Sequence, residues 1–307
     1  MSNTEITALD FDLLGSISVV ENIFNWMAWS PDGKTLAIAN LNDQICFWDL
    51  ETSKHWWQLV RMASAGISYV VWSPDSSIIA SGCVDGTIKL QNAENGQGIS
   101  QNNVDPGSTI DSMTWSSDGS LLAIGSQRKI HLFTPIGNEL INKGTLLQQD
   151  KVESIAFKPN STILAASSNF DVDLWDARTE KLVSKLDDPR GPVGSVAWSP
   201  DGKIIVSGAW GYIYVWNSET EMLIKDFKGA TDWITSVTLS YDGSFLASAS
   251  REGIVRIWSC KDWKMYGEFN QKIGKIGGLA FHPSKYVLAT HDKQGLCVNV
   301  WKLVFSK

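Results

Sequence analysis

The sequence has few cysteines, and they are scattered. Only four occur among 307 residues, at Cys46, Cys83, Cys260 and Cys297, and no two of them form a C-x-x-C pair. Isolated cysteines of this kind are typical of buried free thiols in a reducing compartment. We therefore expect a cytoplasmic protein.

Positive charge is also in short supply. The chain holds 26 Lys and Arg against 33 Asp and Glu, a formal net charge of -7, and its basic residues form no cluster. Binding to nucleic acid depends on a basic stripe that neutralises phosphates. We therefore expect no nucleic-acid partner.

Long apolar runs are missing as well. No stretch reaches the roughly 20 apolar residues that a membrane helix needs. The first segment, MSNTEITALDFDLLGSISVV, has no basic region and its apolar run is interrupted, so it does not fit a signal peptide. We expect no membrane partner.

Motifs for catalysis and metal binding are absent too. Neither G-x-S-x-G nor H-E-x-x-H occurs, and there is no calcium loop. Gly33-Lys34-Thr35 resembles the end of a phosphate loop, but Ala28 occupies the place of the required glycine. His282 and His291 are separated by nine positions and have no third ligand at a zinc-like spacing. We expect no catalytic residues, no metal and no cofactor.

What the sequence does contain is an internal repeat. The phrase WSPDG occurs twice, and degraded copies read WSPDS, WSSDG, FKPNS, LSYDG and FHPSK. The first residues of these seven copies, the anchors, fall at positions 29, 72, 115, 157, 198, 239 and 281, so the period is 41 to 43 residues. A near-constant period of this length indicates an array of equal structural units.

Each unit shows the same order of short strands. The S-P-D-G phrase suits a type I turn, because proline presets φ at its second position and glycine is favoured at its fourth. Later runs in the unit have strand length and a period of two. The position seven residues after the anchor is aliphatic in every copy and is predicted to be core: Leu36, Ile79, Leu122, Leu164, Ile205, Leu246 and Leu288.

The last unit ends one strand early, and the N-terminus has one strand to spare. Sixteen residues before each anchor stands an apolar residue that we expect to pack: Leu13, Trp56, Ile99, Ile141, Leu182, Leu223 and Met265. Six of these belong to a fourth strand of the preceding unit, whereas Leu13 has no preceding unit. We predict that residues 11–20 form the outer strand of the last unit and close a ring. Residues 1–307 would then form a single domain.

These repeats resemble those of the WD-repeat family, whose units end in Trp-Asp, as in Trp48-Asp49 and Trp175-Asp176. The resemblance spans essentially the whole chain, and the S-P-D-G-K phrasing is similar to that of prokaryotic members. It implies an all-β fold, a seven-bladed β-propeller of four-stranded antiparallel blades.

One family feature is missing, namely the histidine that joins a buried tetrad with Ser/Thr, Trp and the turn Asp. A buried indole N–H still needs an acceptor. We expect serine hydroxyls or water to serve, the family's serine position being kept at Ser112, Ser154, Ser195 and Ser236.

Tryptophan is abundant, with 15 residues, of which nine fall at repeat positions and are expected to be core. Two of the others stand out. Trp210 precedes Gly211 in the turn between the second and third strands of its unit, and Trp233 lies where a loop enters an innermost strand.

The resemblance also implies where a partner binds. In the family the partner sits over the narrower face, reached by side chains six and four residues before the anchor and by the residue before the turn Asp. Carried onto this chain, these positions give the candidate partner-binding residues Trp233, Arg251, Trp210, Phe170, Lys151, Glu153, Asp111 and Lys275. The aromatic residues and Arg251 would form one sector and dominate the binding energy; alternatively, these side chains only plug the channel mouth.

We therefore expect a non-catalytic protein–protein interaction module or scaffold that is monomeric by itself and binds a peptide or a folded protein. Two alternatives stay open. One is a propeller enzyme that acts on a small molecule at the channel mouth through Asp111 and Glu153. The other is a purely structural subunit of an assembly, because the fold alone does not decide between these functions.

Overall fold

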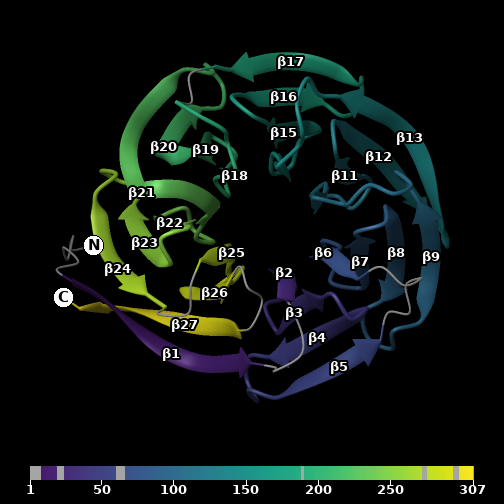
Figure 1. Cartoon of the computed structure of the whole chain (residues 1–307), viewed down its shortest axis with the longest axis horizontal. Coiled ribbons are helices and arrows are strands. Elements are labelled where there is room, and N and C mark those ends of the chain that lie inside the picture. The colour runs from purple at the N-terminus through teal and green to yellow at the C-terminus, as the bar shows by residue number, and fades with distance from the viewer. Residues whose placement is uncertain are drawn as a thin grey trace.

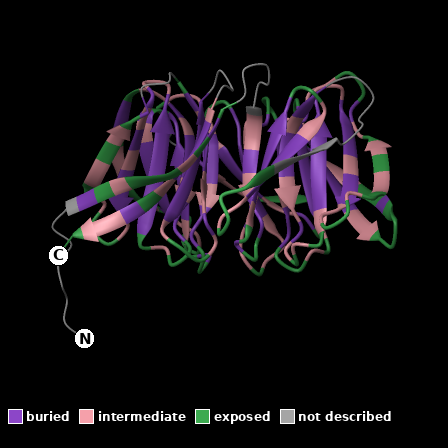
Figure 2. Ribbon diagram, turned by 90° about the horizontal axis from the view of Figure 1, so that it is seen from below, coloured by how far each residue is buried: buried purple, intermediate pink, exposed green. Residues whose placement is uncertain are grey.

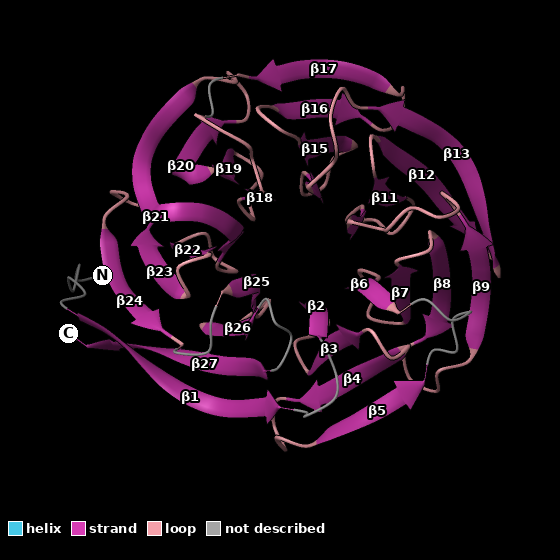
Figure 3. Ribbon diagram, in the orientation of Figure 1, coloured by secondary structure: helices cyan, strands magenta, loops and turns pink. Residues whose placement is uncertain are grey.

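The computed structural model of the chain describes residues 8–18, 24–59, 66–187, 190–271, 275–292 and 297–306. Within these ranges every regular element is a β-strand, as Figure 3 shows. No helix among the described residues is long and apolar enough for a membrane crossing.

The strands form antiparallel sheets of consecutive chain segments. One four-stranded sheet joins the two ends of the chain in the order β1-β27-β26-β25: β1 (Ala8–Ser18), β25 (Ile276–Phe281), β26 (Val287–Asp292) and β27 (Cys297–Ser306). Two more follow in chain order: β2 (Phe24–Trp29), β3 (Thr35–Asn40), β4 (Gln44–Asp49) and β5 (His55–Leu59); then β6 (Ile67–Trp72), β7 (Ile78–Cys83), β8 (Thr87–Asn92) and β9 (Gly98–Asn103).

The middle of the chain continues the pattern. Two four-stranded sheets consist of β10 (Ser112–Trp115), β11 (Leu122–Ser126), β12 (Lys129–Ile136) and β13 (Glu139–Leu147), and of β14 (Ser154–Phe157), β15 (Ile163–Ser167), β16 (Val172–Asp176) and β17 (Lys181–Leu186). The remaining sheet has seven described strands: β18 (Ser195–Trp198), β19 (Ile204–Gly208), β20 (Trp210–Asn217), β21 (Leu223–Leu239), β22 (Phe245–Ser250), β23 (Ile254–Ser259) and β24 (Met265–Asn270).

The sheets are arranged in a ring: β2, β6, β18 and β25 lie towards the axis, whereas β5, β9, β13, β17, β24 and β1 lie on the perimeter (Figure 1). Along the inside, β2 contacts β6, β6 contacts β10, and the series continues through β14, β18, β21 and β25. β25 in turn contacts β2. The protein is therefore an all-β propeller.

β1 lies beside β27, so the beginning of the described chain pairs with its end. The register runs from Ala8 opposite Ser306 to Ser18 opposite Cys297. Of the predicted outer strand at residues 11–20, positions 11–18 lie in β1, and the strand starts three residues earlier than predicted. Residues 19 and 20 lie outside the described residues.

The core follows the repeat. All seven aliphatic residues that stand seven positions after an anchor have no exposed surface, which confirms the predicted core position: Leu36, Ile79, Leu122, Leu164, Ile205, Leu246 and Leu288. They lie on second strands, where both faces of the sheet are covered by neighbouring sheets. Such strands are buried on either side and exclude water most completely.

The S-P-D-G turns form as predicted. The Ser30 hydroxyl donates a 2.6 Å hydrogen bond to Oδ1 of Asp32, which also accepts the amide of Lys34. Gly33 follows at φ +75°, a conformation that favours glycine. The same serine–aspartate bond recurs in four further turns of this kind. At Asp118, hydrogen bonds led by that of the Ser116 hydroxyl lower the carboxyl pKa to about 2.

The serines at the family position have a different role from the one expected. Ser112 does not accept from an indole; its hydroxyl accepts the amide of Ile155 in the next sheet at 3.1 Å. Ser154, Ser195 and Ser236 make the equivalent bond to the innermost strand of the next unit. These hydroxyls therefore link neighbouring units along the inside of the ring.

Two buried indoles, those of Trp258 and Trp216, find serine acceptors on the strand that pairs with their own. Trp258 donates to Ser248 at 2.8 Å and Trp216 donates to Ser207 at 3.3 Å. These hydroxyls lie across the strand pair from the tryptophans, so the indole is satisfied without a histidine.

The outer apolar position belongs to the core in only some units. Ile99 and Leu223 are half-buried and pack against core clusters as expected, whereas four others do not. Leu13, Ile141, Leu182 and Met265 are all exposed, between 38% and 53% of their surface. Figure 2 shows the reason, because the perimeter strands are covered on one side only. The side chain of Trp56 lies outside the described residues.

Candidate functional site

A continuous strand carries the centre of the candidate site. β21 is 17 residues long and runs from the perimeter beside β20 to the inside beside β22. The loop that was expected to lead into the innermost strand at Trp233 is therefore replaced by strand. The change of register between Trp210 and Tyr212 places Trp210 directly opposite Trp233.

Two indoles and a guanidinium meet at this point, and we call Trp210, Trp233 and Arg251 the tryptophan ridge. The two indole rings are perpendicular, at 74°, with centroids 6.2 Å apart. The Arg251 guanidinium lies 4.9 Å from the Trp233 ring centroid, a distance suited to a cation–π interaction. Trp210 is 51% exposed, whereas Trp233 and Arg251 are half-buried.

Two glycines make room for the ridge. A Cβ atom at Gly194 would lie 2.3 Å from Nε1 of Trp233, and one at Gly191 would lie 3.0 Å from Cβ of Trp210. Five of the other units have Asn, Ser, Asp, Glu or Thr at the position of Gly194, and the last unit has Gly277. Trp233 thus extends over the neighbouring unit at a position that has no side chain, and Trp210 is the more exposed indole of the pair.

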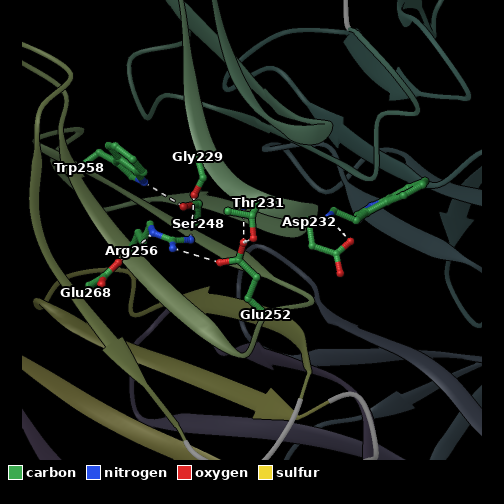
Figure 4. A network of polar contacts seen from close by, with 9 residues as sticks. Gly229, Thr231, Asp232, Ser248, Glu252, Arg256, Trp258 and Glu268 are labelled. Carbon is green, nitrogen blue, oxygen red and sulfur yellow. Dashed lines mark hydrogen bonds and ion pairs between the residues drawn. The ribbon is translucent and has the colours of Figure 1, made fainter.

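A polar network holds the segment of β21 that precedes Trp233 (Figure 4). Arg256 donates to Glu252, to Glu268 and to the carbonyl of Gly229, each at 3.0 Å. Glu252 also accepts the amide and hydroxyl of Thr231. Burial alone would raise the pKa of Glu252, but these donors lower it below its ordinary value.

The three charged candidates further round the ring form one cluster. Nζ of Lys151 lies 3.0 Å from Oδ1 of Asp111 and 3.9 Å from Oε1 of Glu153. Burial alone would lower the pKa of Lys151, but the two carboxylates raise it. The lysine therefore separates and neutralises the carboxylates that a propeller enzyme would use.

The last two candidates are exposed. Phe170 lies in the turn between β15 and β16 with 51% of its surface exposed, and Lys275 directly precedes β25. Among the ring and ion-pair contacts of the described residues, neither joins the ridge. The predicted sector is thus divided into a compact ridge and separate side chains.

Arg190 belongs beside the ridge, although its position in the repeat gave no indication of this. Its guanidinium lies 5.0 Å from the Tyr212 ring centroid and 3.4 Å from Asp226, and its amide donates to the Tyr214 hydroxyl. The adjoining glycine, Gly191, supports Trp210. The one sequence feature that could have pointed to Arg190 is its place in a glycine- and proline-rich connection between two units.

Among the described residues, no group of three or more His, Cys, Asp and Glu side chains is placed to hold a metal ion. The chemistry available at the ridge is apolar contact, cation–π stacking and hydrogen bonding from a guanidinium. None of these interactions involves a reacting group.

Comparison with known families agrees with the architecture. The family model of the WD domain, G-beta repeat, matches residues 19–49, 142–176, 180–217 and 221–259. The model of the anaphase-promoting complex subunit 4 WD40 domain matches residues 54–118. No curated protein matches the chain significantly. Together the two family models span more than half of the chain, and the chain belongs to the WD-repeat family.

Proposed function

We propose that this protein is a non-catalytic binding module that presents the tryptophan ridge to a protein or peptide partner. WD-repeat propellers generally mediate protein interactions, and they are typically not enzymes. The observation that carries the proposal is Trp210, a half-exposed indole held in place by strand pairing, by Trp233 and by glycine beneath it. Exposed, rigidly held Trp and Arg residues are the side chains that most often dominate an interface.

We further infer seven blades, closed by β1. In support, the seven-stranded sheet divides at β21, whose first part pairs with β20 and whose last part pairs with β22. Counting each half as one blade gives seven inner strands in mutual contact. Pairing of β1 with β27 would then supply the fourth strand of the last blade.

The ridge is tested by affinity purification from the native organism followed by mass spectrometry. The tagged parent is compared with the W210A/R251A variant and with M222A, which alters a 68% exposed residue directly before β21, on the perimeter. We expect partners recovered with the parent and M222A to be lost with W210A/R251A. Equal recovery in all three would refute the ridge as the binding surface.

The closure is tested separately by deleting residues 1–18. Loss of β1 uncovers the edge of β27 and removes the buried Leu9 and Ile17. We expect a loss of solubility or of cooperative thermal unfolding, because an uncovered edge strand invites aggregation. Unchanged melting would refute closure by β1.

A second candidate function is that of a subunit in a larger assembly. It is favoured by the match of residues 54–118 to a family model named after a complex subunit. Gel filtration of native extracts distinguishes the two candidates. A stable assembly that survives the W210A/R251A substitution favours the structural role.

We also propose a cytoplasmic location and a monomeric state in isolation. Support for the location comes from the four cysteines, which are all free, with Cys46 and Cys83 buried. Burial raises the pKa of each of these two thiols to about 12. Cell fractionation and sedimentation of the purified protein test the two statements.

A further inference from the structure

A groove with apolar walls lies where β1 meets the neighbouring sheet of β2 to β5. Its volume is about 380 Å³, and more of its exposed lining is apolar than polar. Its lining comes from β1, from the turn after β4 and from the edge of β26 and β27: Leu14, Leu50, Lys285, Tyr286, Val287, Lys302 and Leu303.

The exposed leucine in this groove results from a β-bulge. Leu13 pairs with Trp301 and Gly15 pairs with Val300, so Leu14 is the extra residue. A bulge changes the direction of its extra side chain, and Leu14 is 40% exposed. A Cβ atom at Gly15 would lie 3.1 Å from the Trp48 indole, so glycine lets β1 approach the next sheet closely.

Two lysines border the apolar walls. Lys285 and Lys302 are both exposed, and neither forms an ion pair among the described residues. Asp12 is the register partner of Lys302 on β1, yet the two side chains form no ion pair within 4.0 Å. In a chain of net charge -7 these two unpaired cations beside an apolar groove favour an acidic ligand.

We propose that this groove binds a linear peptide segment in which an aliphatic side chain is flanked by aspartate or glutamate. The aliphatic side chain would pack against Leu14 and Leu50, and the flanking carboxylates would pair with Lys285 and Lys302. This site is separate from the ridge. The turn that holds Lys285 joins β25 to β26, which corresponds to the S-P-D-G turns, at the end of the sheets opposite to the β19–β20 turn beside Trp210.

The test is selection of a random dodecapeptide phage library on the immobilised full-length chain. The enriched peptide is then synthesised with a fluorescent label, and its affinity is measured by fluorescence anisotropy. The expected consensus is an aliphatic residue between acidic ones. The K285E/K302E variant should bind this peptide at least roughly tenfold more weakly, because two attractive charges become repulsive.

Two variants complete the design. L14D should also weaken binding, because it replaces part of the apolar wall by a charge that repels an acidic peptide, whereas W210A should leave binding unchanged. Tryptophan fluorescence melting verifies that each variant is folded, and all four positions are exposed enough to tolerate substitution. No enriched peptide, a consensus without acidic residues, or equal affinity in K285E/K302E and the parent overturns the proposal. Binding that is lost in W210A instead assigns the peptide to the ridge.

Discussion

Mild acid should weaken this protein through its buried histidines. His131, His282 and His291 are 6%, 1% and 3% exposed, whereas His55 is exposed. Burial lowers the pKa of each of the three below the ordinary value of 6.5. Two of them, His282 and His291, belong to the sheet of β25 to β27 and contact residues of the sheet of β2 to β5.

His291 has the least room for a second proton. Its Nδ1 donates to the carbonyl of Asp292 at 3.0 Å, and its Nε2 is buried with no hydrogen-bond partner among the described residues. Trp26, Gly277 and Gly278 surround the ring, and the charged group that faces it is Asp292. Protonation of Nε2 would bury a charged donor without an acceptor, which is costly.

His282 is fully bonded in its neutral form. Its Nε2 donates to the carbonyl of Gly33 at 2.7 Å, and its Nδ1 accepts the amide of Ser284. A second proton on Nδ1 would replace that acceptor by a donor and break the bond to Ser284. Asp32 favours the charged ring and Lys285 opposes it, so burial decides the direction of the pKa shift.

The direction and magnitude of the change in stability with pH follow from proton linkage. Below about pH 6.5 the unfolded chain binds protons that the folded chain does not, so the free energy of unfolding falls as pH falls. Each histidine contributes a slope of up to about 1.4 kcal/mol per pH unit until its folded pKa is reached. Asp118 and Asp242, with pKa values of about 2, lose their stabilisation only below about pH 4. Asp173, whose pKa burial raises, acts in the opposite direction.

The assay is urea unfolding followed by tryptophan fluorescence between about pH 7.5 and 5. The parent should lose stability across this range, H291Q should lose it with a shallower slope, and H55Q should follow the parent. A parent whose free energy of unfolding is constant over the range, or an H291Q slope equal to that of the parent, would refute the reasoning.

Three further substitutions test the packing and polar contacts. Gly194→Ala should lower the free energy of unfolding by roughly 1 to 3 kcal/mol, because the new Cβ would lie 2.3 Å from an indole nitrogen. Gly98→Ala is the control: its Cβ would meet nothing closer than 3.4 Å, and thermal unfolding should be nearly unchanged. Ser248→Ala should cost about 1 to 3 kcal/mol in urea unfolding by leaving the Trp258 indole without its acceptor; a cost near zero would mean that another group accepts. Arg256→Met should cost about 3 kcal/mol, because a carboxylate only 14% exposed loses its partner, and unchanged melting would show that the network does not hold this part of β21.

The sequence predicts most of the fold because the features that define each repeat are local in the chain. Turn residues, strand alternation and the aliphatic position after each anchor act within a few residues of one another. Leu36 and its six equivalents are buried as predicted because every second strand has the same neighbours. The strand at β1 was also predictable, since the count of strands left one surplus at the beginning and one missing at the end.

The tertiary structure decided what lies between units. Ser112 binds the next sheet and not an indole, and Trp233 fills the space that Gly194 leaves in another unit. Residues about one repeat apart in sequence make these contacts, and no local pattern records how closely two sheets approach. The exposure of Leu14 depends likewise on a bulge in a pairing between strands from opposite ends of the chain. Local hydrogen-bonding and packing preferences thus specify each unit, whereas the geometry of the ring specifies which side chains meet across its joints and which stay exposed for a partner.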